Sequence, residues 1–183
     1  MGRGSSGIGS AGAKRVSKAL KSIEDRIRRN STESAVVIDS NGNVLFDTSD
    51  GHETSVQLSV EQMRIAHGQI LTHNHPHGYF LSDADIGAAT TLGLKQLRAT
   101  TPDGRAFVLE RTESTPADNS LYHAYRIAIK STAGNVVAKV YDPKLTTREL
   151  SHKASLEHTK ILNKWLEENA PRFGWAFREE KSK

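Results

Sequence analysis

The chain has 183 residues, 36% of them hydrophobic, and its 25 basic and 21 acidic side chains give a formal net charge of +4. Its mean hydropathy is −0.53, and it contains no cysteine. These values favour one domain with a real core; they exclude disulfides and thiolate metal sites, and no apolar run approaches the roughly 18 residues of a membrane span.

The first 30 residues are expected to form a basic flexible arm with a short helix, and residues 31–183 the main domain. Gly and Ser dominate residues 1–12, which predicts a linker, and apolar residues at helical spacing predict a helix over 13–29. Residues 1–30 carry eight basic side chains against two acidic ones, a charge of +6 (eight minus two). Such an arm can bind nucleic acid or an acidic protein surface, although a solvated tail has the same pattern.

After this arm the sequence changes to short β-branched segments. Residues 35–38 and 44–46 predict two strands, and Asn41-Gly42 between them is a strong signal for a hairpin turn. Residues 69–72 predict a buried strand that leads into a cluster of histidines.

The rest of the chain is expected to alternate helices with hairpins. Ser82 begins a helix that ends near Gly93, and residues 102–104 (Pro-Asp-Gly) form a hairpin turn. A second hairpin is expected over 124–129 and 136–141. The other expected elements are helices over 60–67 and 146–169 and strands over 95–100, 106–109 and 175–177. Together they predict an α/β (α+β) fold, a mixed sheet flanked by helices.

The most informative segment contains His73 and His75, which follow the buried strand, and then Ser82 and Asp85. Side chains alternate along a strand, so the two histidines share one face and can bind one cation. Asp85 is expected to add an oxygen ligand from the first turn of the next helix. This set suits Zn²⁺, although Fe and Mn bind similar sets, and three protein ligands leave a position open for a catalytic water. Taken separately, the two motifs also fit surface histidines and a helix N-cap.

A metal-activated water needs a general base, and no other acidic residue of the metal loop is placed for this role. Glu33, immediately before the first strand, is the best candidate, and Glu53 and Glu24 are the runners-up. An ordinary exposed glutamate at the edge of a strand would have the same sequence position.

The order of these residues resembles the JAMM/MPN (JAB-domain) zinc metalloprotease family. That family has a Glu on an early strand, then His-x-His-Pro, a loop and Ser-x-x-Asp. This chain has Glu33, then His-Asn-His-Pro at 73–76 and Ser-Asp-Ala-Asp at 82–85. The residues of this motif are similar to those of the bacterial and phage branches of the family, namely RadC-like proteins and JAB domains of phage head-morphogenesis or toxin systems. The resemblance runs from Glu33 to about Leu109.

The resemblance implies a curved sheet with a JAB/cytidine-deaminase-like core. It also implies that His73, His75 and Asp85 bind zinc, that Glu33 is the general acid/base on the activated water, and that Ser82 stabilises the oxyanion. The loop between the second histidine and the serine is one residue shorter than the usual family spacing. This departure affects the expected position of Ser82 more than that of Asp85.

The function implied is zinc-dependent hydrolysis of peptide or isopeptide bonds in a protein or peptide substrate, such as a ubiquitin-like conjugate. The alternative is a non-catalytic JAB-like binding or assembly module of a phage or toxin system. A metal-dependent nuclease is a third hypothesis, but a nuclease would be expected to carry further carboxylates for a second metal ion. We expect no membrane association and a cytoplasmic location, in the host cytoplasm if the gene belongs to a phage.

Overall fold

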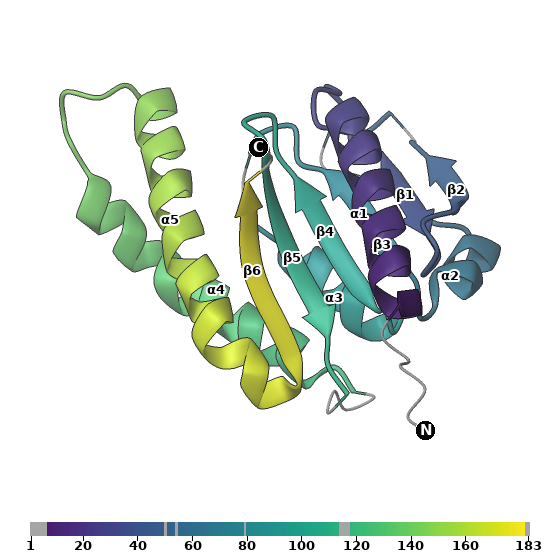
Figure 1. The fold of residues 1–183 in the computed structure, drawn as a ribbon. Coiled ribbons are helices and arrows are strands. Elements are labelled where there is room, and N and C mark those ends of the chain that lie inside the picture. The colour runs from purple at the N-terminus through teal and green to yellow at the C-terminus, as the bar shows by residue number, and fades with distance from the viewer. Residues whose placement is uncertain (1–6, 50, 54, 79, 114–117, 182–183) are drawn as a thin grey trace.

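The computed structural model describes residues 7–49, 51–53, 55–78, 80–113 and 118–181 (Figure 1). In this part of the chain, six strands form one sheet in the order β2-β1-β3-β4-β5-β6, parallel between β3 and β4 and antiparallel elsewhere. The strands are β1 (Ala35–Ile38), β2 (Val44–Thr48), β3 (Ile70–Asn74), β4 (Gln96–Thr100), β5 (Arg105–Arg111) and β6 (Trp175–Lys181). The helices are α1 (Gly7–Ile27), α2 (Val60–Ala66), α3 (Asp83–Thr91), α4 (Ser120–Val140), α5 (Thr147–Asn169) and the short 3-10 helix η1 (Ala170–Phe173). The predicted mixed sheet flanked by helices is confirmed.

Both faces of the sheet are covered, and neighbouring residues of β1 point into two different cores. Ala35 and Val37 belong to the larger core, which α3, α4 and α5 complete, whereas Val36 and Ile38 belong to a smaller core under α1. This follows from the alternation of side chains along a strand, and it explains why the whole of β1 is apolar and buried. Figure 1 shows α1 lying across the face of the sheet opposite to α3.

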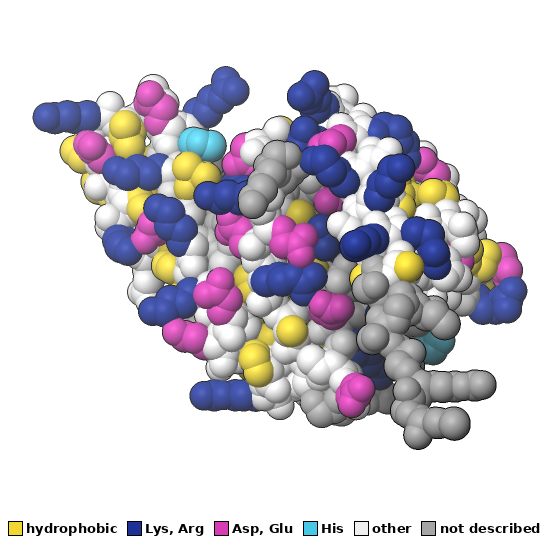
Figure 2. Space-filling model, in the orientation of Figure 1, with side chains coloured by type: hydrophobic (Ala, Val, Ile, Leu, Met, Phe, Trp, Pro, Cys, Tyr) yellow, Lys and Arg dark blue, Asp and Glu magenta, His cyan; other side chains and the backbone are white. Residues whose placement is uncertain are grey.

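The helix near the N-terminus is longer than predicted and is part of the packed structure. It begins at Gly7 rather than at residue 13, and residues 1–6 lie outside the described part of the chain. Leu20, Ile23 and Ile27 are buried on its inner face against strands β1 and β3. Its basic side chains are therefore carried on a fixed helix, and Figure 2 shows Lys and Arg side chains gathered over α1.

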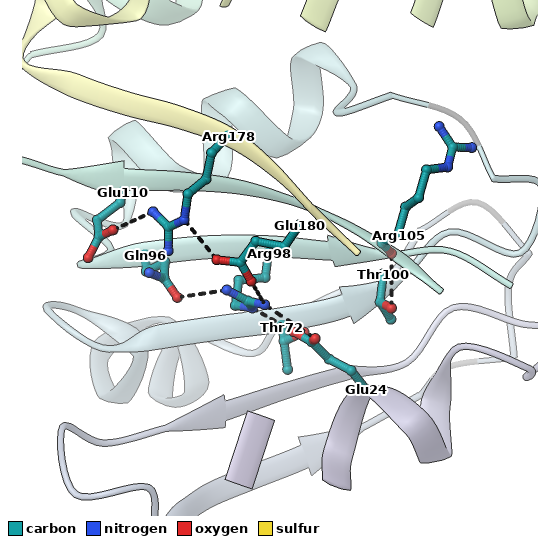
Figure 3. A network of polar contacts seen from close by, with 9 residues as sticks. All are labelled: Glu24, Thr72, Gln96, Arg98, Thr100, Arg105, Glu110, Arg178 and Glu180. Carbon is teal, nitrogen blue, oxygen red and sulfur yellow. Dashed lines mark hydrogen bonds and ion pairs between the residues drawn. The ribbon is translucent and has the colours of Figure 1, made fainter. Parts of the chain in front are cut away.

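A polar network on the same face of the sheet joins α1 to the strands (Figure 3). Arg98 of β4 is buried and donates from Nε to Oε1 of Glu24 at 2.6 Å and from Nη2 to Oε2 of Glu180 at 2.7 Å. The hydroxyl of Thr72 donates to the same Glu24 carboxylate at 3.1 Å. Glu24, a runner-up for the general base, is thus engaged with the far face of the sheet and is not placed to act at the histidines.

Replacing Glu24 with alanine is expected to destabilise the protein by about 3 kcal/mol, because the buried guanidinium of Arg98 would lose one of its two carboxylate partners. The measurement is the free energy of unfolding in urea. Asp25 on the same helix is the matched control: its carboxylate is more exposed and forms surface pairs with Lys21 and Arg28, so its replacement with alanine should cost about 1 kcal/mol or less. Equal small losses in both variants would show that apolar contacts alone hold α1.

The hairpin predicted over 124–129 and 136–141 is wrong: this segment is the single helix α4. The alternating β-branched residues around Ile127 suggested a strand, yet Ile127 is 68% exposed. The buried positions follow a helical spacing instead, at Leu121, Tyr125, Ala128, Val136 and Val140. Gly134, which falls between the two expected strands, lies inside the helix, where an added Cβ would meet no neighbouring atom within 4 Å.

The remaining predicted elements are confirmed, with small changes at their ends. Thr146 caps α5 through a capping box with Glu149, and the final strand is longer than predicted. Gly42 has a φ of +87°, as the predicted turn between β1 and β2 requires. In the described part of the chain, no helix combines the length and apolar character that crossing a bilayer requires.

Candidate metal centre

Strand β3 places His73 and His75 on one face of the sheet. His73 is paired with Ala35 of β1 on one side and with Ala99 of β4 on the other. His75 lies just past the end of β3, where its backbone N–H donates to the carbonyl of Thr100 at 2.8 Å, so the extended alternation continues by one residue. The two imidazoles therefore point in the same direction, as the sequence predicted.

The start of helix α3 places Asp85 opposite the two histidines. Ser82 is the N-cap, and its side chain accepts a hydrogen bond from the backbone N–H of Asp85. In return, Oδ2 of Asp85 accepts from the backbone N–H of Ser82 at 2.6 Å and from its hydroxyl at 2.7 Å. This capping box fixes the rotamer of Asp85 through Oδ2 and leaves Oδ1 facing His73.

The three side chains meet at a single point. Nε2 of His73 lies 2.9 Å from Nε2 of His75 and 3.0 Å from Oδ1 of Asp85, and Nε2 of His75 lies 3.3 Å from Oδ2 of Asp85. Donor atoms about 2.0–2.1 Å from a tetrahedral zinc ion would lie roughly 3.3 Å apart. The spacing and the chemistry of these donors therefore fit a first-row divalent ion, and this is the group of residues that could hold one.

The two histidines favour the ionised form of Asp85 despite its burial. The side chains of His73, His75 and Asp85 are only 6%, 11% and 14% exposed. Burial alone would raise the pKa of Asp85, but the attraction of both histidines and their hydrogen bonds hold this pKa well below its usual range. Nδ1 of His73 is buried, and no described residue hydrogen-bonds to it, so this ring is oriented by packing and by the groups at Nε2.

Glu33 lies in the same cleft as the three metal-ligand candidates. It is only 8% exposed, whereas an ordinary glutamate at the edge of a strand would be solvated. It precedes Ala35 by two residues, and Ala35 is the partner of His73 in the sheet and also lines the cleft. The backbone N–H of Glu33 donates to the carbonyl of His52 at 2.8 Å, which fixes the chain at this point.

Asn74, between the two histidines, is a residue of this site that the sequence pattern did not single out. It is fully buried, and its side chain points away from the histidines toward the segment before β1. Its Oδ1 accepts from the backbone N–H of Ser34 at 2.8 Å, and its Nδ2 donates to the carbonyl of Thr32 at 3.0 Å. Asn74 therefore ties the segment that carries Glu33 to the strand that carries the histidines. A polar residue inside an otherwise buried strand was the available signal.

The structure brings Ser82 to the cleft and pairs its hydroxyl with Asp85. Its predicted role at the oxyanion stays a prediction. The other runner-up, Glu53, also lines the cleft, but it is exposed and its Oε2 lies 3.7 Å from Nε2 of the exposed His77.

A cleft of about 1020 Å³ opens from this centre toward α4 and α5. His158 of α5 lines it, with Nε2 2.8 Å from the hydroxyl of Thr132 and its ring 5.2 Å from that of Phe80. Burial lowers the pKa of His158, which favours its neutral form. The sequence did not predict that α4 and α5 together line the cleft, because the segment that forms α4 was expected to be a hairpin.

Comparisons with protein-family models, with curated proteins and with solved structures find no match for this chain. The resemblance to the JAMM/MPN family therefore depends on the motif residues and their spacing in the sequence alone.

Proposed function

We propose that this protein is a hydrolase of peptide or isopeptide bonds of the JAMM type, with zinc as its ion. One observation carries the proposal: the ligand atoms of His73, His75 and Asp85 lie within 4.8 Å of one another, in a cleft that Glu33 also lines. A metal triad with a buried carboxylate beside it is what hydrolysis by an activated water requires.

The proposed roles follow from the position of each side chain. His73, His75 and Asp85 would hold the ion, which supplies Lewis acidity and makes a bound water more acidic. Glu33 would accept the proton of the attacking water and return it to the leaving amine. The hydroxyl of Ser82, at the N-terminus of α3, would donate to the developing oxyanion after turning from Asp85, and the positive end of the helix dipole supports the same charge.

Two observations favour an amide over a phosphodiester as the substrate. None of the described residues that line the cleft is Lys or Arg, although phosphate groups are usually bound by such side chains. In the described part of the chain, the His73 cluster is the one group of three or more such ligands close enough to share an ion, so support for a second metal is lacking.

The test starts with metal analysis of the purified protein and an assay of three substrate classes with and without a chelator: unmodified peptides, isopeptide-linked ubiquitin-like conjugates and DNA. We expect about one zinc ion per chain and amide cleavage that the chelator abolishes and zinc restores. Zinc at this stoichiometry with every amide substrate intact would instead support the non-catalytic binding module. Chelator-sensitive cleavage of DNA alone would support the nuclease.

A further inference from the structure

The cleft continues well beyond the metal centre, along the outer face of α3. Ala84, Ala88 and Thr91 line it at helical spacing, so small side chains form its floor. The seven steps from Ala84 to Thr91 advance about 10 Å along the helix axis, which is the length of about three residues of an extended chain. A short extended peptide segment matches this length.

The walls of the cleft are mostly apolar and come from segments far apart in the sequence. Val136 and Val137 of α4 and Leu150 of α5 form one side, and Val56 and Leu58 lie among the other lining residues. Val137 is 51% exposed, so this apolar side chain faces solvent within the cleft instead of stabilising the core. The lining is mostly apolar, although hydroxyls such as those of Thr91 and Ser151 interrupt it. Apolar surface that remains open to water in this way is typical of a site that binds an apolar ligand.

The charges of the lining restrict the ligand further. The ionisable lining side chains are the carboxylates of Glu33, Glu53 and Asp85 and several histidines, and none of the described lining residues is Lys or Arg. An acidic segment would therefore meet these carboxylates without a compensating Lys or Arg among the described lining residues. Ala84, Ala88 and Thr91, which line this part of the cleft from the helix, carry no charge. Side chains of a peptide bound there would therefore exchange water for apolar contacts.

We propose that this cleft binds an extended peptide segment with two or three apolar side chains next to the bond that is cut. The inference adds a substrate class to the proposed hydrolase function, and it rests on that function in treating the bound peptide as a substrate. A segment of glycine residues would fit this cleft poorly, because glycine would leave the apolar walls without a partner. A cleft that runs without interruption from the metal-ligand candidates to the walls of α4 and α5 carries the argument.

The test measures binding to the metal-free protein, so that it does not depend on catalysis. The probes are three dansyl-labelled, end-capped pentapeptides, whose three central residues are all leucine, all glycine or all aspartate. Fluorescence anisotropy measures the binding of each peptide. We expect the leucine peptide to bind at least about tenfold more tightly than the other two, since three buried side chains add apolar contact that glycine lacks.

Variants locate the site on the protein. Val137→Asp, at an exposed position of the cleft wall, should weaken leucine-peptide binding about tenfold, and Ala88→Arg should block the floor. Ala138→Asp, the exposed next residue of α4 outside the cleft lining, is the matched control and should bind within about twofold of the parent chain. Circular dichroism checks that each variant keeps its helices.

Equal binding of the three peptides, or equal binding by the parent, Val137→Asp and Ala88→Arg chains, would overturn the inference. If selective binding is found but no substrate is ever cleaved, the cleft assignment stands and the hydrolase proposal fails. If the zinc-loaded protein cleaves glycine and leucine peptides at the same rate, the hydrolase proposal stands and the preference for apolar side chains fails.

Discussion

Replacing Glu33 with glutamine is expected to lower the rate of amide hydrolysis by about 100- to 10,000-fold, the range by which positioned general acids and bases accelerate such reactions. Glutamine keeps the size and the polar end of the side chain but cannot accept a proton from water. Because Glu33 is not among the three clustered ligand candidates, zinc should remain near one ion per chain. The measurements are single-substrate kinetics and elemental analysis of the same sample.

Glu53→Gln is the matched control for this experiment. Glu53 is a second glutamate of the same cleft, but it is exposed and interacts with His77 at the surface. Its replacement should leave the rate within about threefold of the parent protein, in line with the small effects of most surface substitutions. Loss of zinc together with activity in Glu33→Gln would mean that Glu33 has a structural role, and a larger loss in Glu53→Gln would move the base to that residue.

Replacing Asp85 with asparagine is expected to weaken zinc binding by at least about 100-fold. Loss of a residue that only hydrogen-bonds to a metal ligand already weakens binding by about 10- to 100-fold, and a direct ligand should cost no less. Asparagine is nearly the same size, and its amide oxygen can still accept the capping hydrogen bond from the backbone N–H of Ser82. The start of α3 should therefore survive, while the negative charge of the carboxylate that faces His73 and His75 is lost.

Thermal unfolding reads out this loss without any assay of activity. Zinc at one hundred times its Kd stabilises a folded protein by about 2.7 kcal/mol, which for a chain of this size raises the Tm by roughly 5–10 °C. At the same zinc concentration, Asp85→Asn should show almost no rise. Asp83→Asn is the control, because this neighbour in the first turn of α3 lies at the surface, 3.6 Å from Arg126. A full zinc-dependent rise in Asp85→Asn would refute the assignment of Asp85 as a ligand.

The sequence was informative wherever local chemistry decides the structure. The β-branched run of β1, the turn at Gly42 and the capping box of Ser82 and Asp85 are local signals, and each was predicted correctly. The convergence of His73 with His75 followed from strand alternation, and the approach of Asp85 followed from the helix start in the next loop.

The errors lie where tertiary contacts decide. In α4 the local pattern around Ile127 favours a strand, but packing on α3 and α5 selects the helix, with the hydroxyl of Tyr125 donating to the carbonyl of Leu81 at 2.7 Å. Helix α1 is fixed by the pairing of Glu24 with Arg98, which lies 74 residues away. Nothing in the local sequence of the basic N-terminal segment indicates this pairing. The outer wall of the cleft was invisible for the same reason, since it depends on α4 being a helix.

Asn74 has a consequence for how this protein can change. By bonding to the backbone of Thr32 and Ser34, it makes the general-base candidate and the two histidines parts of one backbone unit. The bordering segment that holds Ser49 and His52 also bonds to the backbone of Glu33, through the hydroxyl of Ser49 and the carbonyl of His52. Mutation and selection at cleft residues outside these bonds can therefore change specificity while the reacting groups keep their alignment.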